Sequence, residues 1–402
     1  MATKPFYTSN ALIDAVKRKM AIPIAQVTFS DNDILSFANE EMFLEQVPSI
    51  LQYHEEYLVF SQTVPMLPKQ SRYPIPNRAI GMKLRDVFYR DAAGQLVQMS
   101  RINPDDRSFF EVNSNTTPIP IHYYLQNNTL VITPEVTQNA TGNLIFSYYL
   151  RPNSLVTDDQ AAVCLSFTKT ITVDNATIVS GDTITIGTHV TTAGVDFAIG
   201  ANSAATAANL SAYLGTLTEH NLTSKVSSNI VSVSYTTRSL TFSTTNSAGF
   251  AIQTSITVDT TTMPSSIVAG GLVDILQTDG GHSTLAFDVL LASNSVSSSS
   301  ITLSESQLPA DFIVGDYICA QYECIVPQVP TDLHNLLAER TCARILESLG
   351  DKEGLQAANA KISNLESKQA TILDSRVEGS PMKVLNRTGL LRSSRIRFGR
   401  RG

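Results

Sequence analysis

Residues 121–132 read Ile-His-Tyr-Tyr-Leu-Gln-Asn-Asn-Thr-Leu-Val-Ile. This stretch decides the predicted fold of the region around it. Two short runs rich in aromatic and branched apolar residues flank the pair Asn127-Asn128. Asparagine tolerates the positive φ that a two-residue hairpin turn requires, so the pattern predicts two antiparallel strands. Similar runs, such as Leu144 to Leu150, recur between about Val59 and Pro152. We therefore expect a compact β region there.

Helices are predicted on the N-terminal side of this region. Ser9-Asn10 can cap a helix over Ala11 to Met20, and Pro23 closes it. Ser30 can cap a second helix, with Asp33 completing a capping box. Apolar residues expected on the inner faces of the two helices are Leu12, Ile13, Val16, Ile34, Leu35, Ala38, Met42 and Leu44. Pro48 is expected to interrupt or kink the second helix.

The C-terminal third also predicts helices. Pro330, with Thr331 and Asp332, begins one that Gly350 ends. Its apolar positions repeat with the helical period and are Leu333, Leu336, Leu337, Ile345, Leu346 and Leu349. Asp351 then caps a longer amphipathic helix, which breaks near residues 379–381.

A change of composition near Cys164 indicates an insertion. From there to about Ser300 only three basic residues oppose eight acidic ones. Residues 183–186 and 231–235 alternate apolar and polar side chains, as half-buried strands do, and Ser203 can cap a helix over Ala204 to Leu214. A low-complexity linker is the alternative, but a linker would not alternate so regularly.

The predicted fold class is therefore α+β. Residues 1–165 and 268–382 form the core, in which N- and C-terminal helices pack together with a β region. Residues 166–267 form an inserted immunoglobulin-like all-β domain, and residues 383–402 form a basic tail.

Charge is distributed unevenly along the chain. The formal net charge is −7. The residues after Glu378 include seven basic ones and no acidic one, so the first 378 residues together carry −14. An acidic body with a basic tail predicts that the tail meets nucleic acid or an acidic protein surface; a solvated, disordered end is the alternative. The chain opens without a signal-peptide pattern and has no run of about 18 apolar residues, so we expect a soluble protein made in the cytoplasm.

The sequence shows no recognisable motif for catalysis. It contains no nucleotide-binding glycine loop, no G-x-S-x-G and no H-E-x-x-H. The four cysteines suit buried thiols better than a metal site. Asp105-Asp106 could be paired carboxylates, but Pro104 before them favours a turn. Four tyrosines could form a stacking platform or belong to the core, namely Tyr123, Tyr124, Tyr148 and Tyr149. We expect no enzyme, no cofactor and no metal.

Several phrases resemble structural proteins of tailed bacteriophages. The longest is Ser71 to Val87, followed by Arg101 to Asp106; the others are Tyr149 to Asn153, Gly280 to Ser283, and Pro327 to His334 continuing to Leu349 to Gly354. The residues that carry the resemblance are Arg72, Pro74, Pro76, Arg78, Gly81, Arg85, Pro104, Asp105, Arg151, Pro152, Pro330, Gly350 and Asp351. Together the phrases look like the head-to-tail connector, adaptor or ring protein of podovirus-type virions, including those of crAss-like phages. Within the insertion, residues 194–210 are similar to a β domain repeated across phage tail and baseplate proteins.

This resemblance implies a non-enzymatic virion protein of the tail neck. Connectors of this kind form rings, predominantly dodecamers, that dock on the portal protein, present a surface to the next tail or ring protein and let genomic double-stranded DNA pass through the lumen. An acidic lumen would not hold phosphates, so the acidic body fits this role. No membrane is involved.

The resemblance also implies that the tail reaches the portal. The residues expected to dock there are Lys383, Arg387, Arg392, Arg395, Arg397, Phe398, Arg400 and Arg401. Contact with packaged DNA is the rival interpretation. The alternative for the whole protein is a receptor- or glycan-binding tail protein that uses the inserted domain, and a cell-wall hydrolase is a third.

Overall fold

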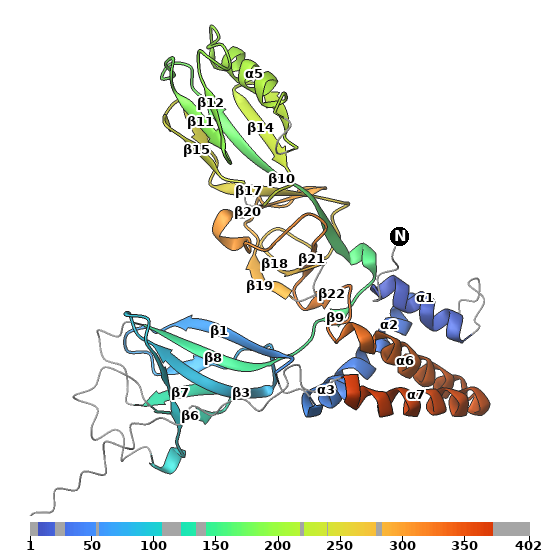
Figure 1. The fold of residues 1–402 in the computed structure, drawn as a ribbon. Helices are drawn as coiled ribbons and strands as arrows, with labels where there is room; N and C mark the ends of the chain where they lie inside the picture. Colours follow the sequence, from blue (N-terminus) through green and yellow to red (C-terminus); the bar gives the residue numbers. More distant parts are fainter. Residues whose placement is uncertain are drawn as a thin grey trace, which may run out of the picture.

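Three parts make up the fold, which we describe from a computed structural model for residues 7–20, 29–53, 56–106, 122–133, 142–217, 221–238, 240–278 and 284–372. The chain is a mixed α+β protein with most of its regular structure in sheets. Figure 1 shows a β module at lower left, a helical module at lower right and an elongated β lobe above them. The predicted basic tail, residues 383–402, lies outside the described residues.

The helical module unites both ends of the described chain. Its elements are α1 (Ser9–Lys19), α2 (Asp31–Glu41), the π-helical turn η1 (Met42–Gln46), α3 (Val47–Tyr53), the 3-10 turn η5 (Thr331–Leu333), α6 (His334–Leu349) and α7 (Lys352–Ile372). Helices α1, α2 and α7 all contact α6. Most of the apolar stripes predicted on α1 and α6 meet in one core, where Leu12, Val16 and Leu337 are fully buried. Leu349 was wrongly predicted to join them: it lies in the last turn of α6 and is 50% exposed. The N- and C-terminal helices therefore pack together.

Caps determine where these helices begin and end. The predicted Ser30–Asp33 capping box is confirmed. Gly350 ends α6, as predicted, with a φ of 71°. Asp351 caps α7, as predicted, since its Oδ1 accepts the backbone amide of Gly354 at 3.0 Å. The predicted cap of α1 is wrong by one residue, because the Thr8 hydroxyl accepts the Ala11 amide and the helix begins at Ser9.

Leu44 is exposed, which corrects the predicted apolar stripe of α2. Its side chain is 60% exposed, whereas Met42 is fully buried. The reason is the π-helical turn: the Val47 amide donates to the Met42 carbonyl, so an extra residue rotates Leu44 off the inner face. Pro48, which has no amide proton to offer the Leu44 carbonyl, lies inside α3 and does not end it.

The β module holds the first eight strands in two four-stranded sheets. The strands are β1 (Val59–Pro65), β2 (Arg72–Pro74), β3 (Ala79–Arg90), β4 (Leu96–Gln98), β5 (Ser100–Arg101), β6 (His122–Gln126), β7 (Thr129–Thr133) and β8 (Asn143–Leu150). Their orders are β1-β8-β3-β4 and β2-β7-β6-β5, and residues of both sheets share one core. The predicted hairpin is confirmed: β6 pairs antiparallel with β7, and Asn127 adopts a φ of 53°.

The β lobe is built around one long strand, β10 (Ala161–Val173). The other elements of the lobe are β11 (Thr183–Ile186), β12 (His189–Thr192), α5 (Ser203–Leu214), β13 (Thr223–Ser227), β14 (Ile230–Tyr235), β15 (Phe242–Thr244), β16 (Phe250–Ile252), β17 (Ser255–Thr260), β18 (Leu272–Leu276), β19 (Thr284–Leu290), β20 (Ser300–Ser304) and β21 (Tyr317–Ala320). Nine of these strands form one sheet, while β12, β11 and β15 form another. The cap of α5 is Asn202 and not the predicted Ser203.

The predicted limits of the insertion, 166 and 267, fall inside this lobe. Strand β10 continues through residue 166, with one irregularity in its pairing between Cys164 and Ser166. Residues 161–163 pair with β21, and Cys164 and residues 166–173 pair with β14, β16 and β17. Strand β20, which follows residue 267, pairs with β17. Figure 1 shows β10 running from the base of the lobe towards its far end. The sheet is therefore continuous across both predicted boundaries.

Candidate functional site

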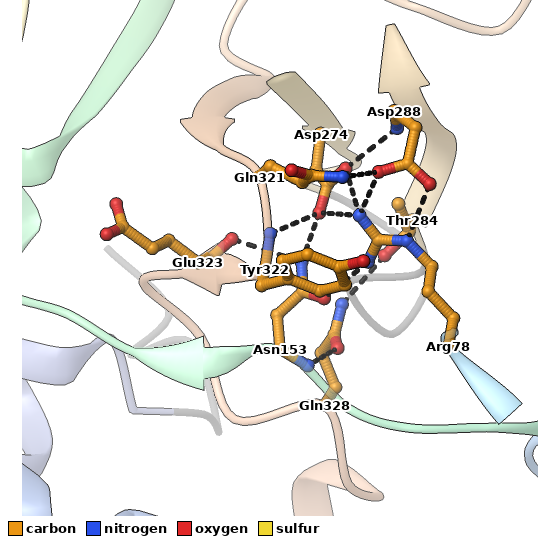
Figure 2. Close-up of polar contacts among 9 residues, drawn as sticks. All are labelled: Arg78, Asn153, Asp274, Thr284, Asp288, Gln321, Tyr322, Glu323 and Gln328. Atoms are coloured by element: carbon orange, nitrogen blue, oxygen red, sulfur yellow. Dashed lines mark hydrogen bonds and ion pairs between the residues drawn. The ribbon is translucent and has the colours of Figure 1, made fainter. Parts of the chain in front are cut away.

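The three parts of the fold meet around one buried arginine, Arg78, and we call its surroundings the Arg78 junction. The junction is defined by the residues Arg78, Asn153, Asp274, Asp288, Gln321, Tyr322 and Gln328 (Figure 2). They come from the turn before β3, the segment after β8, the strands β18 and β19, the turn after β21 and the segment before α6. Close by, the two-residue strands β9 (Ser154–Leu155) and β22 (Glu323–Cys324) pair in parallel.

A tight turn presents Arg78 to the lobe. The Ala79 amide donates to the Pro76 carbonyl at 2.9 Å, which closes the turn, and the Arg78 carbonyl accepts the Arg151 amide at 2.7 Å. The backbone is thus held from two sides. Only 4% of Arg78 is exposed, so its charge requires partners within the protein.

Two carboxylates supply those partners. Nη2 of Arg78 lies 2.8 Å from Oδ1 and 3.0 Å from Oδ2 of Asp274, which is fully buried. Nη2 and Nε reach Oδ1 and Oδ2 of Asp288 at 2.7 and 3.0 Å, in the fork geometry that guanidinium offers to carboxylates. The guanidinium carbon also lies 4.6 Å from the ring centroid of Phe287 and 4.3 Å from that of Tyr322. This combination of a fork to one carboxylate, a second carboxylate on Nη2 and two aromatic contacts suits arginine and not lysine.

The Asp274 carboxylate accepts hydrogen bonds from four other members of the junction. Besides Arg78, its oxygens accept Nδ2 of Asn153 at 2.7 Å and the amides of Asp288 and Tyr322 at 3.0 and 3.2 Å. Asp288 and Tyr322 both have positive φ values, 54° and 65°, which are costly for non-glycine residues. The two strained residues are therefore those whose amides are aimed at the buried carboxylate.

The electrostatics of the junction favour the charged forms of Arg78 and Asp288. Burial alone would lower the pKa of Arg78, but the Asp288 hydrogen bond and the charges of both carboxylates raise it. Burial likewise works to raise the pKa of Asp288, but hydrogen bonds from Arg78 and Gln321 lower it overall. At Asp274 burial raises the pKa, and the donors around it oppose that rise.

The junction extends into the helical module. The backbone amide of Asn153 donates to Oε1 of Gln328 at 2.7 Å. Gln328 lies just before η5 and α6. Two residues further on, Leu155 exchanges two hydrogen bonds with the Asn39 side chain of α2, at 2.7 and 3.1 Å. Arg78 also hydrogen-bonds Asn153 through Nη1 at 3.0 Å. One short segment after β8 therefore ties all three parts together.

Only some residues that carry the resemblance lie at the junction. Arg78 is its centre, and Arg151 and the buried Pro152 directly precede Asn153. Gly81 has a φ of 59° at an irregularity of β3, between Ala79 and Leu84. Pro76 belongs to the turn that presents Arg78. The remaining ones lie elsewhere in the fold, mostly at the surface: Arg72, Pro74, Arg85, Pro104, Asp105, Pro330, Gly350 and Asp351.

The structure decides two alternatives left open by the sequence. Pro104 to Asp106 forms a 3-10 turn in which the Asp106 amide donates to the Asn103 carbonyl at 3.1 Å, with both aspartates exposed. The stacking platform is wrong, because Tyr123, Tyr124 and Tyr148 are buried. Tyr123 and Tyr148 belong to the core that the two sheets of the module share.

The four cysteines are buried free thiols, as predicted. Within the described ranges, no group of three or more potential ligands is placed to hold a metal ion. No helix in this same part of the chain is long and apolar enough to cross a membrane.

Sequence reasoning missed the partners of Arg78. Asp274 interrupts the apolar run Leu272 to Leu276, and a charged residue in a buried strand needs a partner, so a signal existed. Asp288 and Tyr322 had no such signal, because their roles depend on backbone conformation. No protein-family model matches this sequence, and no curated protein matches it significantly.

Proposed function

We propose that the protein is a structural virion component of a tailed bacteriophage. It forms an oligomeric ring, a dodecamer by resemblance, beneath the portal, joins capsid to tail and extends the DNA channel. It acts without cofactor or chemistry. The acidic body, which carries −14 outside the last 24 residues, would keep such a channel from holding the DNA phosphates.

One observation carries this proposal: three of the phrases that carry the resemblance, far apart in the sequence, converge at the Arg78 junction. Ser71 to Val87 supplies Arg78, Tyr149 to Asn153 supplies Arg151 to Asn153, and the phrase that begins at Pro327 supplies Gln328. A chance likeness of short phrases gives no reason for them to touch. A shared architecture does, since residues that hold modules together must be retained with their partners.

The junction also suits the mechanical demands of a connector. A subunit that links two other assemblies has to keep its modules in fixed relative positions under load. A buried ion pair adds little net stability, but an arrangement that separates its partners leaves an uncompensated buried charge and is disfavoured. We infer that the Arg78 junction fixes the angle between the β module, the lobe and the helices.

We further propose that the basic tail docks on the portal. Its arginines can hold carboxylates with two hydrogen bonds each, and Ile396 and Phe398 add apolar anchors. An immunoglobulin-like fold for the lobe also stays a proposal. Helix α5, which packs against β13 and β14, would be an addition to such a sandwich.

Negative-stain images of the purified full chain test the proposal. A closed ring, with a mass that is a multiple of 43.6 kDa, is expected of a connector. A trimeric spike would instead support the receptor- or glycan-binding alternative, with the lobe as the adhesin.

A further inference from the structure

A polar groove of about 290 Å³ opens between α2 with η1, α6 and α7. Its charged lining consists of four glutamates and two arginines, a net charge of −2: Glu41, Glu45, Glu347, Glu366, Arg340 and Arg344. Leu355 and Ile362 of α7 add an apolar wall. One side is formed by a π-helical turn. Such turns are rare in proteins, and those that occur often lie at functional sites.

Two glutamates of the groove form hydrogen-bonded ion pairs with its two arginines, and the other two form longer ion pairs and are more exposed. Nε of Arg344 hydrogen-bonds the buried Glu41, and Nη2 of Arg340 reaches Glu366 at 2.7 Å. Glu45 and Glu347 lie 4.0 and 3.6 Å from the same two guanidinium groups, and their side chains are 57% and 62% exposed. These two carboxylates are thus available to a cationic ligand.

Arg340 offers the groove a hydrogen-bond donor, which is a second and independent observation. Its side chain is only 9% exposed, yet Nη1 has no hydrogen-bond partner among the described residues. The Glu45 carboxylate at 4.0 Å is too far to accept. A buried donor without an acceptor costs about 1–3 kcal/mol. A carbonyl oxygen of a peptide backbone entering the groove would satisfy Nη1, while basic side chains of the same peptide would meet Glu45 and Glu347.

We propose that this groove binds residues 383–402 of its own chain. That segment carries seven basic residues and no acidic one, which complements the lining, and Ile396 and Phe398 match the apolar wall. Only a short stretch of chain connects the groove to this segment, because α7 lines the groove and ends at Ile372. The eleven residues from 372 to 383 span up to about 36 Å when extended, enough to fold back. A short tether also gives an effective concentration of about 1 mM, which favours binding within one chain over capture by a second copy.

Binding in the groove and docking on a portal would exclude each other, since both use the same segment. The groove would then hold the tail until a portal is offered. The inference concerns the free chain and does not require the ring, so either proposal can fail without the other.

Photo-crosslinking of the full chain tests the inference. p-Benzoyl-phenylalanine is placed at position 398, the chain is irradiated, and crosslinked peptides are identified by mass spectrometry. We expect crosslinks to α6, α7 or η1 within the same molecule, as a mixture of isotope-labelled and unlabelled chains will show. The double variant Glu45→Gln/Glu347→Gln should lower their yield by about 3- to 10-fold, since each partly exposed ion pair is worth up to about 1 kcal/mol.

The matched control removes two carboxylates of the helical module that do not line the groove, Asp14→Asn and Glu353→Gln; both residues are exposed. Its crosslink yield should equal that of the parent chain. Crosslinks confined to other surfaces, crosslinks only between labelled and unlabelled chains, no crosslinks at all, or an equal loss in the control would each overturn the inference.

Discussion

Nη2 of Arg78 lies 2.8 Å from Oδ1 of Asp274, although the two residues are 196 positions apart in the sequence. Arg78 precedes β3 of the β module and Asp274 lies in β18 of the lobe. Both are nearly inaccessible to solvent, at 4% and 0% exposure. The contact therefore joins two modules through a pair of charges that neither module could bury alone.

Replacing Arg78 should cost far more stability than replacing a surface arginine. Arg78→Ala leaves the Asp274 carboxylate buried without its cation, and breaking a buried pair in this way costs about 3–5 kcal/mol. Arg78→Lys should recover only part of the loss, because an ammonium group cannot form the fork to Asp288 while also reaching Asp274. The measurement is the free energy of unfolding in urea.

Arg85→Ala is the matched control for this change. Arg85 is exposed and its ion pair with Asp86 is 3.6 Å long, so its loss should cost less than about 1 kcal/mol. The double variant Arg78→Ala/Asp274→Ala should be more stable than the sum of the two single changes predicts. Equal effects of Arg78→Ala and Arg85→Ala would refute the role given to the junction.

Excising residues 166–267 should prevent folding. The cut severs β10 after Leu165 and removes β17, the strand to which β20 is paired. Unpaired strand edges and an opened core favour aggregation. The soluble fraction and the circular dichroism of the product measure the outcome, with a chain lacking residues 383–402 as the control that keeps every described element. A soluble, cooperatively folded excision product would contradict the continuous sheet.

The stability of the protein should fall as the pH rises above about 9. Burial raises the thiol pKa of Cys164, Cys324 and Cys342 from 9.0 to about 12. Above pH 9 the unfolded chain therefore loses protons that the folded chain keeps, and this contribution to stability disappears between pH 9 and 12. Each thiol adds a slope of up to about 1.4 kcal/mol per pH unit.

Urea unfolding at pH 8, 9, 10 and 11 measures that slope. In Cys342→Ala the slope should be shallower, since one of the four buried thiols is gone. A slope that is unchanged in this variant would show that other groups, such as buried tyrosines, dominate the alkaline loss.

Local signals in the sequence predicted local structure well. The Ser30–Asp33 capping box, the positive φ at Asn127 and the end of α6 at Gly350 each depend on a few neighbouring residues. The prediction that Leu44 lies on the inner face was wrong because the π-helical turn changes the phase of the helix. Neither the apolar periodicity nor Pro48 reveals such a turn. The phase of a helix is thus predictable only while its hydrogen-bond pattern stays regular.

The long-range features were less accessible from the sequence. The change of composition near Cys164 suggested an insertion, but β10 passes through that point because its two halves pair with different neighbours. Arg78 was singled out by resemblance, whereas its partners Asp274 and Asp288 were not. Their contacts depend on strand order and on positive φ values at Asp288 and Tyr322, which no local pattern encodes.

Deleting residues 383–402 should leave the fold intact and weaken binding to the portal. The deletion removes seven positive charges, so the loss should be largest at low salt and shrink as salt screens the parent chain's contacts. The affinity of purified full-length and shortened chains for purified portal measures the effect. The same affinity for both chains would exclude a docking role for the tail.

The most direct test of the proposed function is an electron-microscopy class average of the purified chain mixed with its candidate portal protein. A connector predicts a closed ring stacked coaxially on the portal, with an open central channel. Monomers or trimeric spikes that ignore the portal would contradict the connector and favour a tail protein that binds receptors or glycans.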